Sequence, residues 1–354
     1  MGLSADHIDE PGFREMRTAR SRTLLTVSFA TIGAILLTGC AGERGDEIVL
    51  VGFAAPAEAN SEVFNSFAAT TAGHGAQKVE SYGASGDQSR SVANGLPADL
   101  VHLSVTPDLE RLVEAGFVDQ GWDDNAWAGQ LTTSVVVLVV RDGNPLGITG
   151  WEDLTRSDLE IVTPNPGSSG AARWNILGAL ASQLHGDGTQ ADLESYMQRF
   201  IDNVAVFPGS GRDATMAFLD GTGDVLISYE NEAILGVQQG EEFDYIVPES
   251  SVLIQNVAAV TKDAPAQARQ LHEFALSPQG QAIYASFGFR PVEHGPDPIE
   301  IDEVRGANDP THPFPEVEQL ATVEDDFGGW DQVMDDYFDE DGSITRLIEE
   351  SGRS

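Results

Sequence analysis

Three short segments of the chain are rich in glycine and serine and lead into a predicted helix, which is an arrangement that can bind an anion. They lie at residues 82–88, 163–175 and 208–215. The first turn of a helix leaves backbone N–H groups without partners, and the helix dipole adds to their attraction for negative charge. Three such turns brought together would saturate the oxygens of a dehydrated tetrahedral oxyanion without a buried counter-charge, whose own desolvation is costly.

Each of these turns, taken alone, is explained more simply by helix capping. Ser85 and Gln88 have the spacing of a capping box, and Gly95 suits the end of the helix that would follow. The third segment opens a predicted helix that continues through Leu219. Only convergence of the three turns in the folded chain would distinguish a binding site from three ordinary caps.

The remaining polar residues do not form the pattern of an enzyme. The histidines are scattered without the spacing of a metal site, no serine lies in a G-x-S-x-G turn, and no Walker motif is present. His102 follows an apolar pair and is interpreted as a residue packed in the protein interior, or between two lobes if the fold has them. Residues 339–342 resemble part of a calcium loop, but the glycine comes too early and no glutamate follows at the required position. The sequence therefore predicts a protein that is not an enzyme, with no cofactor and no metal.

The charge of the chain limits its partners. Its 354 residues include 57 Asp and Glu against 19 Lys and Arg, a net charge of -38, and Lys78 and Lys262 are the only lysines. Such a surface repels nucleic acid and anionic lipid headgroups, so no nucleic-acid partner is expected. It also repels a free dianion at low ionic strength, so a site for such a ligand must hold it by short-range contacts.

The N-terminal residues have the features of an export signal. Four arginines precede an apolar run at residues 24–37 that is too short to span a bilayer, and a Thr-Gly pair precedes Cys40, the only cysteine. This pattern predicts a lipoprotein with lipid on Cys40, held at the outer face of the cytoplasmic membrane or in the periplasm. An uncleaved signal anchor would leave the protein on the same side. With one cysteine, no internal disulfide is possible.

Alternating strand-like and helix-like segments after residue 46 indicate an α/β fold. Residues 47–52 are predicted to form a buried strand. The strongest strand signal lies at 134–140 and a comparable one at 252–261, and these two could be the hinge crossings of a two-lobed protein. The expected domains are a signal peptide at 1–39, a lipidated linker at 40–46, a first lobe at 47–134 and 252–295, a second lobe at 135–251, and an acidic C-terminal extension docked on the lobes at 296–354.

Apolar residues at helical spacing within the acidic C-terminal extension predict a docked helix with a solvated acidic face. The acid-dense stretch covers residues 324–341. Apolar residues within it include Phe327, Trp330, Met334, Tyr337 and Phe338.

The order of several motifs closely resembles that of the periplasmic sulfate-binding proteins. These motifs are SGDQ at 85–88, TPNPGSSGAARWN at 163–175, GDVLISYENEA at 223–233, SPQGQ at 277–281, FRP at 289–291 and DDFGGW at 325–330. The resemblance covers almost the whole chain after the signal. It implies a two-lobed fold of the type II periplasmic-binding-protein class, a ligand cleft between lobes joined by two hinge strands, and delivery of sulfate or thiosulfate to the permease and ATPase subunits of an ABC importer.

In that family the anion is held by main-chain amides, serine hydroxyls and an indole N–H, without salt bridges. Carried over residue by residue, the resemblance implicates Ala55, Ser85, Ser169, Gly170, Ala171, Gly211 and Tyr229. The family usually has aspartate at position 55, and glycine is common at 171. Both changes are compatible with contacts made through the backbone.

Tyr229 is the departure with most chemical consequence, because the family has there the tryptophan whose indole binds the anion. A phenol can donate a hydrogen bond as an indole does, but it can also accept one. Asp87 and Asp213 replace residues that are usually lysine and glycine, and either could intrude on the site. Arg173 and Arg212 lie close to the binding turns and are interpreted as partners in surface or interlobe salt bridges.

The sequence leaves other ligands and roles open. Molybdate, tungstate and phosphate differ from sulfate in size and protonation rather than in the fold that binds them, and thiosulfate is not distinguished from sulfate. A surface lipoprotein without a transport role is a further alternative, although the Ser-Gly turns argue against it. The expected form is a monomer.

Overall fold

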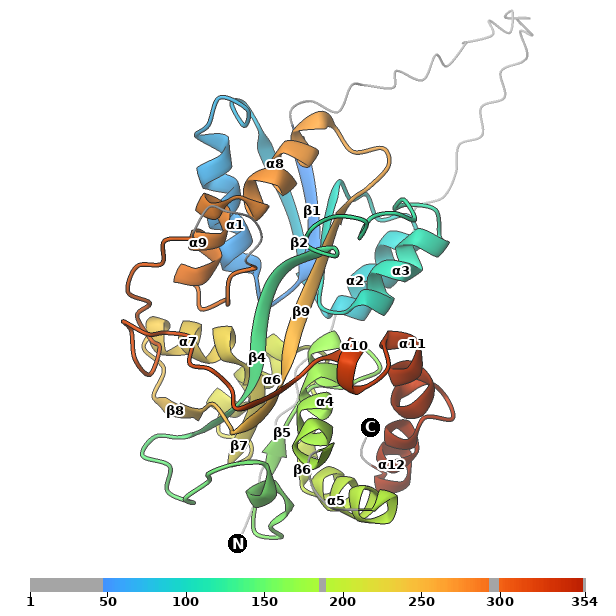
Figure 1. The fold of residues 1–354 in the computed structure, drawn as a ribbon, viewed down its shortest axis with the longest axis vertical. Helices are drawn as coiled ribbons and strands as arrows, with labels where there is room; N and C mark the ends of the chain where they lie inside the picture. Colours follow the sequence, from blue (N-terminus) through green and yellow to red (C-terminus); the bar gives the residue numbers. More distant parts are fainter. Residues whose placement is uncertain (1–46, 185–188, 293–298, 353–354) are drawn as a thin grey trace, which may run out of the picture. The chain divides into compact units, whose positions relative to one another are not determined.

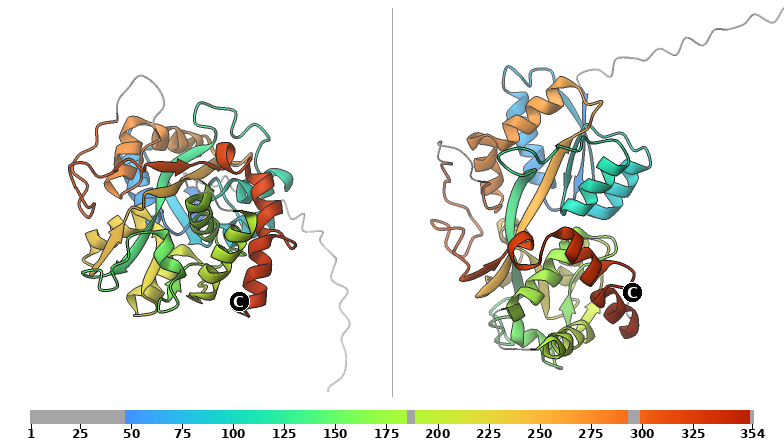
Figure 2. Two further views of the ribbon diagram at one scale, coloured as in Figure 1. Left: turned by 60° about the horizontal axis from the view of Figure 1, so that its bottom comes forward. Right: turned by 45° about the vertical axis from the view of Figure 1, so that its right-hand side comes forward.

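The computed structural model describes residues 47–184, 189–292 and 299–352 (Figures 1 and 2). The signal and Cys40 lie outside these residues. The first lobe contains β1 (Glu47–Phe53), α1 (Ala57–Ala68), β2 (Gln77–Gly83), α2 (Ser85–Ala93), β3 (Leu100–Leu103), α3 (Thr106–Glu114), α8 (Ala266–Leu276) and α9 (Pro278–Ser286). The second lobe contains the 3-10 helix η1 (Trp151–Thr155), β5 (Ile161–Val162), α4 (Gly170–Leu184), α5 (Gln190–Asp202), β6 (Val204–Val206), α6 (Gly211–Leu219), β7 (Val225–Tyr229), α7 (Glu230–Gln239) and β8 (Phe243–Ile246).

Two long antiparallel strands, β4 (Gln130–Arg141) and β9 (Ser250–Val260), run from one lobe to the other (Figure 1). The strands follow the order β2-β1-β3-β9-β4-β7-β5-β6, with β8 paired to β4. β4 pairs with β9 as far as Val135 and then with β7 from Val136 onward. The two lobes are therefore built on different parts of the same two strands.

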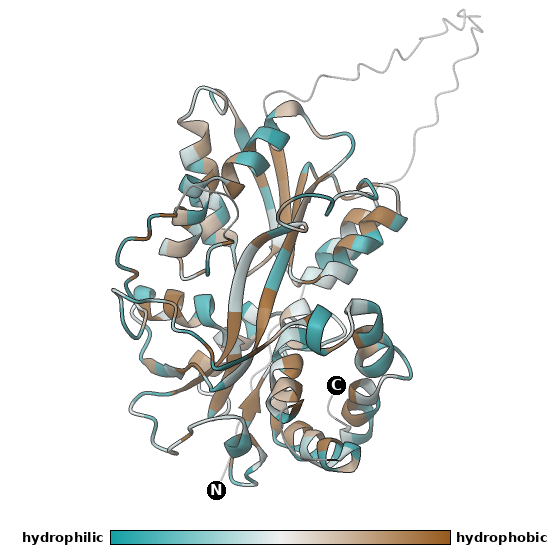
Figure 3. Ribbon diagram, viewed as in Figure 1, coloured by the Kyte–Doolittle hydropathy of each residue, from teal (hydrophilic) through white to brown (hydrophobic). Residues whose placement is uncertain are grey.

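Each lobe has apolar cores on both faces of its strands. Figure 3 shows hydrophobic residues, in brown, in the strands of both lobes. In β4, Val136 and Leu138 face the core formed with α4 and α5, whereas Val135 and Val137 face the core formed with α6 and α7. Successive side chains of a strand point to opposite faces, so a strand covered on both sides must be apolar throughout. This explains the continuous Val and Leu run of β4.

The C-terminal residues add β10 (Gln319–Ala321), α10 (Val323–Asp326), α11 (Trp330–Val333), the π-helical segment η2 (Met334–Phe338) and α12 (Ser343–Ser351). β10 pairs in parallel with the start of β9, and the helices lie beside α4 and α5 (Figure 2). Trp330 packs against Trp174 edge to face, with ring centroids 5.0 Å apart. Among the described residues, no helix has the length and apolar character needed to cross a membrane.

The three strands expected from the sequence are present as β1, β4 and β9, with somewhat different ends. The prediction of a capping box at Ser85 and Gln88 is wrong. Ala84 is the N-cap of α2, and no side chain caps it. The Ser85 hydroxyl instead accepts a hydrogen bond from the backbone N–H of Ser104, at 2.9 Å, so a contact with the segment after β3 replaces the local cap.

Candidate functional site

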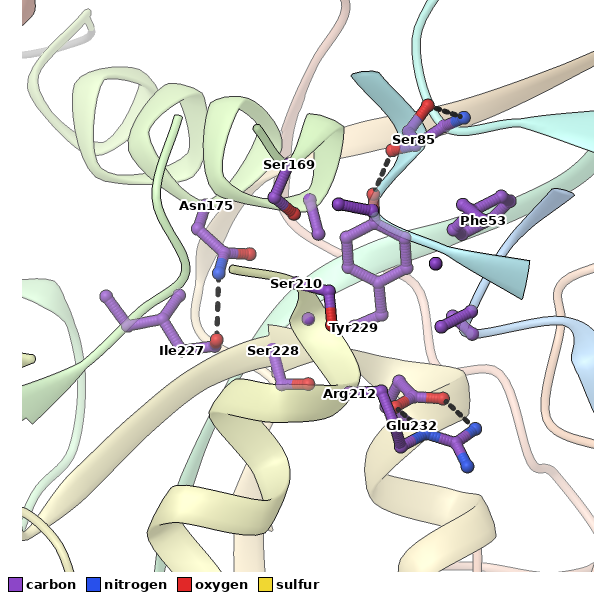
Figure 4. Close-up of a pocket in the computed structure, with 17 residues that line it drawn as sticks. Phe53, Ser85, Ser169, Asn175, Ser210, Arg212, Ile227, Ser228, Tyr229 and Glu232 are labelled. Carbon is purple, nitrogen blue, oxygen red and sulfur yellow. Dashed lines mark hydrogen bonds and ion pairs between the residues drawn. The ribbon is translucent and has the colours of Figure 1, made fainter. Parts of the chain in front are cut away.

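A cavity lies where the two lobes meet, and its walls come from segments far apart in the sequence (Figure 4). It encloses about 390 Å³ of space not filled by protein atoms, part of which is open to solvent. The lining residues from the first lobe are Phe53, Ala54, Ala55, Gly83, Ala84, Ser85 and Ser104. Those from the second lobe are Ser169, Ala171, Asn175, Ser210, Gly211, Arg212, Ile227, Ser228, Tyr229 and Glu232.

Helix N-termini from both lobes converge on this cavity. α2 begins at Ser85, α4 at Gly170 and α6 at Gly211, and Ala55 lies just before α1. Within the described part of the chain, no group accepts a hydrogen bond from the backbone N–H of Ala55, Gly170, Ala171 or Gly211. Donors of this kind at helix starts attract an anion through both their N–H groups and the helix dipole.

Two predicted serines add hydroxyl donors to these amides. The Ser85 oxygen already accepts the N–H of Ser104, so its own proton remains available to donate. Ser169 is buried, and its hydroxyl has no hydrogen-bond partner among the residues described in the structure. Figure 4 shows both side chains at the cavity, one from each lobe.

Tyr229, at the end of β7, reaches across the cavity to the first lobe. Its hydroxyl lies 2.8 Å from that of Ser104, and either oxygen can be the donor. The two residues are almost fully buried, with exposed fractions of 2% for Tyr229 and 0% for Ser104. Burial raises the pKa of Tyr229 far above its usual value, so the phenol remains protonated at any physiological pH.

Asn175, on α4, places an acceptor beside the cavity. Its side-chain nitrogen donates to the Ile227 carbonyl at 2.8 Å and to the Thr163 hydroxyl at 3.1 Å (Figure 4). Because a carbonyl can only accept, this contact fixes the orientation of the amide. The side-chain oxygen is buried and has no partner in the described residues. A ligand that carries a proton could bond to it, whereas a fully deprotonated oxyanion could not.

Arg212, which lies in the cavity wall, is already paired with carboxylates. Arg212 contacts Glu232 of α7 at 3.0 and 3.1 Å and Glu58 of α1 at 2.9 and 3.1 Å. Burial raises the pKa of Glu232, and Arg212 opposes this rise. Burial also acts to raise the pKa of Glu58, but Arg212 brings it below its usual value. Arg212 thus joins the lobes and brings no uncompensated positive charge to the cavity.

Six of the seven residues expected to bind the ligand line this cavity, which are Ala55, Ser85, Ser169, Ala171, Gly211 and Tyr229. The seventh, Gly170, does not line it. A Cβ added to Gly170 would lie 2.7 Å from the side chain of Ser104, so this glycine lets α4 approach the first lobe closely.

Neither of the two acidic residues that could have intruded, Asp87 and Asp213, lines the cavity. Asp87 pairs with Arg90, and Asp213 bonds to the Ser210 hydroxyl. Arg173 is buried and contacts the Pro166 carbonyl. Beyond the residues expected to bind the ligand, four neutral polar residues also line the cavity, namely Ser104, Asn175, Ser210 and Ser228.

Sequence and structure comparisons relate this chain to solute-binding proteins. Residues 48–290 match the model of the bacterial extracellular solute-binding protein family. A sulfate-binding protein of Synechococcus elongatus is 36% identical over 94% of this chain and 98% of its own length. A thiosulfate-binding protein of Escherichia coli is 32% identical over 76% of this chain and 80% of its own length.

A solved structure extends the likeness to three dimensions. The sulfate-binding protein SubI of Mycobacterium tuberculosis has 42% sequence identity and a TM-score of 0.76, and the match covers 83% of this chain and 99% of SubI. The ferric binding protein of Campylobacter jejuni, at 16% identity and a TM-score of 0.59, shares the fold alone. The expected two-lobed α/β fold is thus confirmed. The chain belongs to the bacterial extracellular solute-binding protein family, in the branch that contains the sulfate-binding and thiosulfate-binding proteins.

Proposed function

We propose that the protein captures sulfate in the cavity between its lobes and delivers it to the permease of an ABC importer. The observation that carries this proposal is a set of backbone N–H groups, at Ala55, Ala171 and Gly211, that have no partner among the described residues. These three residues come from both lobes and line one cavity. The hydroxyls of Ser85 and Ser169 add donors to them. The sulfate-binding relatives support the choice of sulfate among anions of this shape.

Neutral dipoles suit the capture of a dianion in this protein. Burying a positive side chain beside the ligand would cost free energy, because that side chain would lose its own hydration. Arg212 is not available for this role, since it pairs with the carboxylates of Glu58 and Glu232. The main-chain N–H groups and hydroxyls are held in place by the helices that carry them. They can therefore replace the hydration shell of sulfate with little reorganisation on binding.

Ligand contacts on both lobes would stabilise a closed form. We place the hinge where β4 and β9 cross, with the first lobe at residues 47–134 and 252–295 and the second at 135–251. A ligand that binds both lobes favours the state in which they meet, and that state is the one we expect the permease to recognise. The C-terminal extension at 296–354 would move with the second lobe, because β10 and the C-terminal helices contact β9, α4 and α5.

The same proposal covers the remaining partners. The protein binds its ligand without chemical change and is therefore not an enzyme. Lipid on Cys40 would hold it at the outer face of the cytoplasmic membrane, where as a monomer it meets the permease and ATPase subunits. Thiosulfate is a second candidate ligand, favoured by the thiosulfate-binding relative.

The proposal is tested by calorimetric titration of the purified protein with sulfate, thiosulfate, molybdate and phosphate at two pH values and moderate salt. We expect tight sulfate binding that does not change with pH, and no binding of phosphate. Binding of phosphate in preference to sulfate would contradict the proposal. Binding of none of the four anions would also overturn it.

A further inference from the structure

The contact between Ser104 and Tyr229 joins the two lobes at the cavity. Ser104 follows β3 in the first lobe, and Tyr229 ends β7 in the second. Their hydroxyl oxygens lie 2.8 Å apart, both side chains are buried, and both residues line the cavity. The contact can therefore form only when the lobes are close together.

The backbone of Ser104 is held at three points, so the position of its side chain is well defined. Its N–H donates to the Ser85 hydroxyl at 2.9 Å. Its carbonyl accepts from the indole of Trp174 at 2.8 Å and from the side-chain amide of Asn256 at 3.1 Å. The Trp174 contact comes from the second lobe, which shows that the Ser104 backbone is itself part of the interface between the lobes.

A count of protons shows what the hydroxyl pair can offer a ligand. Two hydroxyls carry two protons, and the contact between them uses one. The second proton remains on Ser104 if Tyr229 is the donor, or on Tyr229 if Ser104 is the donor. A phenol is the more acidic of the two groups, so donation from Tyr229 to Ser104 leaves the Ser104 proton directed to a third group. Both residues line the cavity, so a ligand bound there is a candidate for that third group.

We propose that Ser104 is a ligand-binding residue and that it forms with Tyr229 a hydroxyl pair that donates one hydrogen bond to the bound oxyanion when the lobes close. The proposal rests on the proposed function of the cavity and adds a donor to it. Donation from Tyr229 polarises the Ser104 hydroxyl and strengthens its bond to the anion. Either hydroxyl can supply this bond if the other is removed, because each lies at the cavity.

This interchange predicts a particular pattern in a double-mutant cycle on sulfate affinity. Ser104→Ala leaves the Tyr229 proton for the ligand, and Tyr229→Phe leaves the Ser104 proton. We therefore expect each single variant to lose less than about threefold in affinity. The double variant should lose about 10- to 100-fold, which corresponds to one hydrogen bond to a charged group and exceeds the product of the single effects.

A purely structural role of the pair predicts the opposite pattern. If the contact served only to hold the lobes together, each single variant would already break it, and the double variant would bind no more weakly than either. That result, or additive single effects, would overturn the proposal. The proposal would also be overturned if two results came together. Ser104→Ala would bind sulfate as tightly as the native protein, and the double variant would bind it as tightly as Tyr229→Phe.

Matched controls separate binding from folding. Ser89→Ala and Tyr196→Phe remove buried hydroxyls, one from each lobe, that contact backbone carbonyls away from the cavity. We expect both to change the melting temperature without changing sulfate affinity. If the native protein does not bind sulfate, the proposed function fails and the pair proposal falls with it. If it binds sulfate but the cycle lacks the expected coupling, the pair proposal alone fails.

Discussion

Ser168 and Ser169 are adjacent in the turn before α4, yet their hydroxyls have different surroundings. The Ser168 hydroxyl donates to the Gly209 carbonyl at 2.7 Å and does not line the cavity. The Ser169 hydroxyl faces the cavity without a partner in the described residues. The two serines therefore form a matched pair for testing which hydroxyl contacts the ligand.

Ser169→Ala should weaken sulfate binding by about 1.5–3 kcal/mol, because it removes a hydrogen bond to a charged ligand. Ser168→Ala should leave the affinity within about twofold of the native value, since it changes the same turn without changing the cavity wall. Calorimetric titration of both variants measures the difference. Equal affinities in the two variants would show that Ser169 does not contact the ligand.

His102 makes the stability of the protein sensitive to mild acid. It is buried between Asn60 and Thr132, and burial lowers its pKa to about 3, with a further contribution from His272. Below pH 6.5 the unfolded chain takes up a proton at this residue while the folded chain does not. The contribution of His102 to stability is therefore lost as the pH falls from about 6.5 toward 3.

His102→Gln removes this titration and retains a polar side chain. Between pH 7 and pH 5 the native protein should lose about 2 kcal/mol more unfolding free energy than the variant. Urea unfolding at the two pH values measures this difference, and the change common to both proteins accounts for the carboxylates. An equal loss in the two proteins would mean that His102 titrates normally in the folded state.

Part of the site could be predicted from single residues, and part could not. Ser85, Ser169 and Gly211 lie in turns whose composition is visible in the sequence. Ser104 and Ser228 have no such local signal, because Ser104 follows a short apolar strand and Ser228 lies within one. Their role depends on strand pairing and lobe contact, which bring together residues more than 100 positions apart.

Among the elements, α4 approaches the first lobe so closely that its first residue has no room for a side chain. A Cβ on Gly170 would lie 2.7 Å from both the Cβ and the Oγ of Ser104, and 3.1 Å from Val105. These atoms belong to short side chains on a buried segment, so they cannot move aside easily. Gly170 therefore sets how far the lobes can close.

Gly170→Ala should weaken sulfate binding by about 1–3 kcal/mol, since the added methyl group must be accommodated by a shift between the lobes. Gly209→Ala is the control, because its added Cβ would make only an ordinary contact of 3.6 Å with the Asp213 carboxylate. Titration with sulfate measures both affinities. Native affinity in Gly170→Ala would show that the lobes do not close to this separation when the ligand is bound.

Elements with strong local signals were predicted, and short ones were not. β4 and β9 are long strands with both faces covered, so a continuous apolar run marks the second half of β4, and two apolar stretches on either side of Gln255 and Asn256 mark β9. β5, β6 and β10 have two or three residues each, and pairing with a neighbouring strand rather than local sequence defines them. The prediction of a capping box at Ser85 was wrong for a related reason. The Ser85 hydroxyl accepts the backbone N–H of Ser104, which is distant in the sequence, instead of an N–H in its own helix.

In the whole molecule, Arg212 forms an ionic link between the lobes. It bonds to Glu58 of the first lobe and to Glu232 of the second. The Glu58 side chain is 38% exposed, so solvent and salt weaken its share of the link. This contact should stabilise the closed form modestly and without touching the ligand.

Glu58→Gln should weaken sulfate binding by about 0.5–1 kcal/mol, with a smaller effect at high salt. Loss of a negative charge alone would favour anion binding by this acidic protein, so the control must carry the same change in charge. Glu62→Gln provides it on an exposed position of the same helix. If both variants change affinity equally, the link to Arg212 does not contribute to closure.

The attachment of the C-terminal segment gives the molecule a natural place for an optical reporter. β10 extends the ladder of β9 at Ser250–Val252, and α12 packs beside α5. A fluorophore on the exposed face of α12 would therefore travel with the second lobe, at a distance from the cavity wall. Paired with a second dye on α1, it would convert the approach of the lobes into a change in energy transfer, so the same fold that captures the anion could report its concentration.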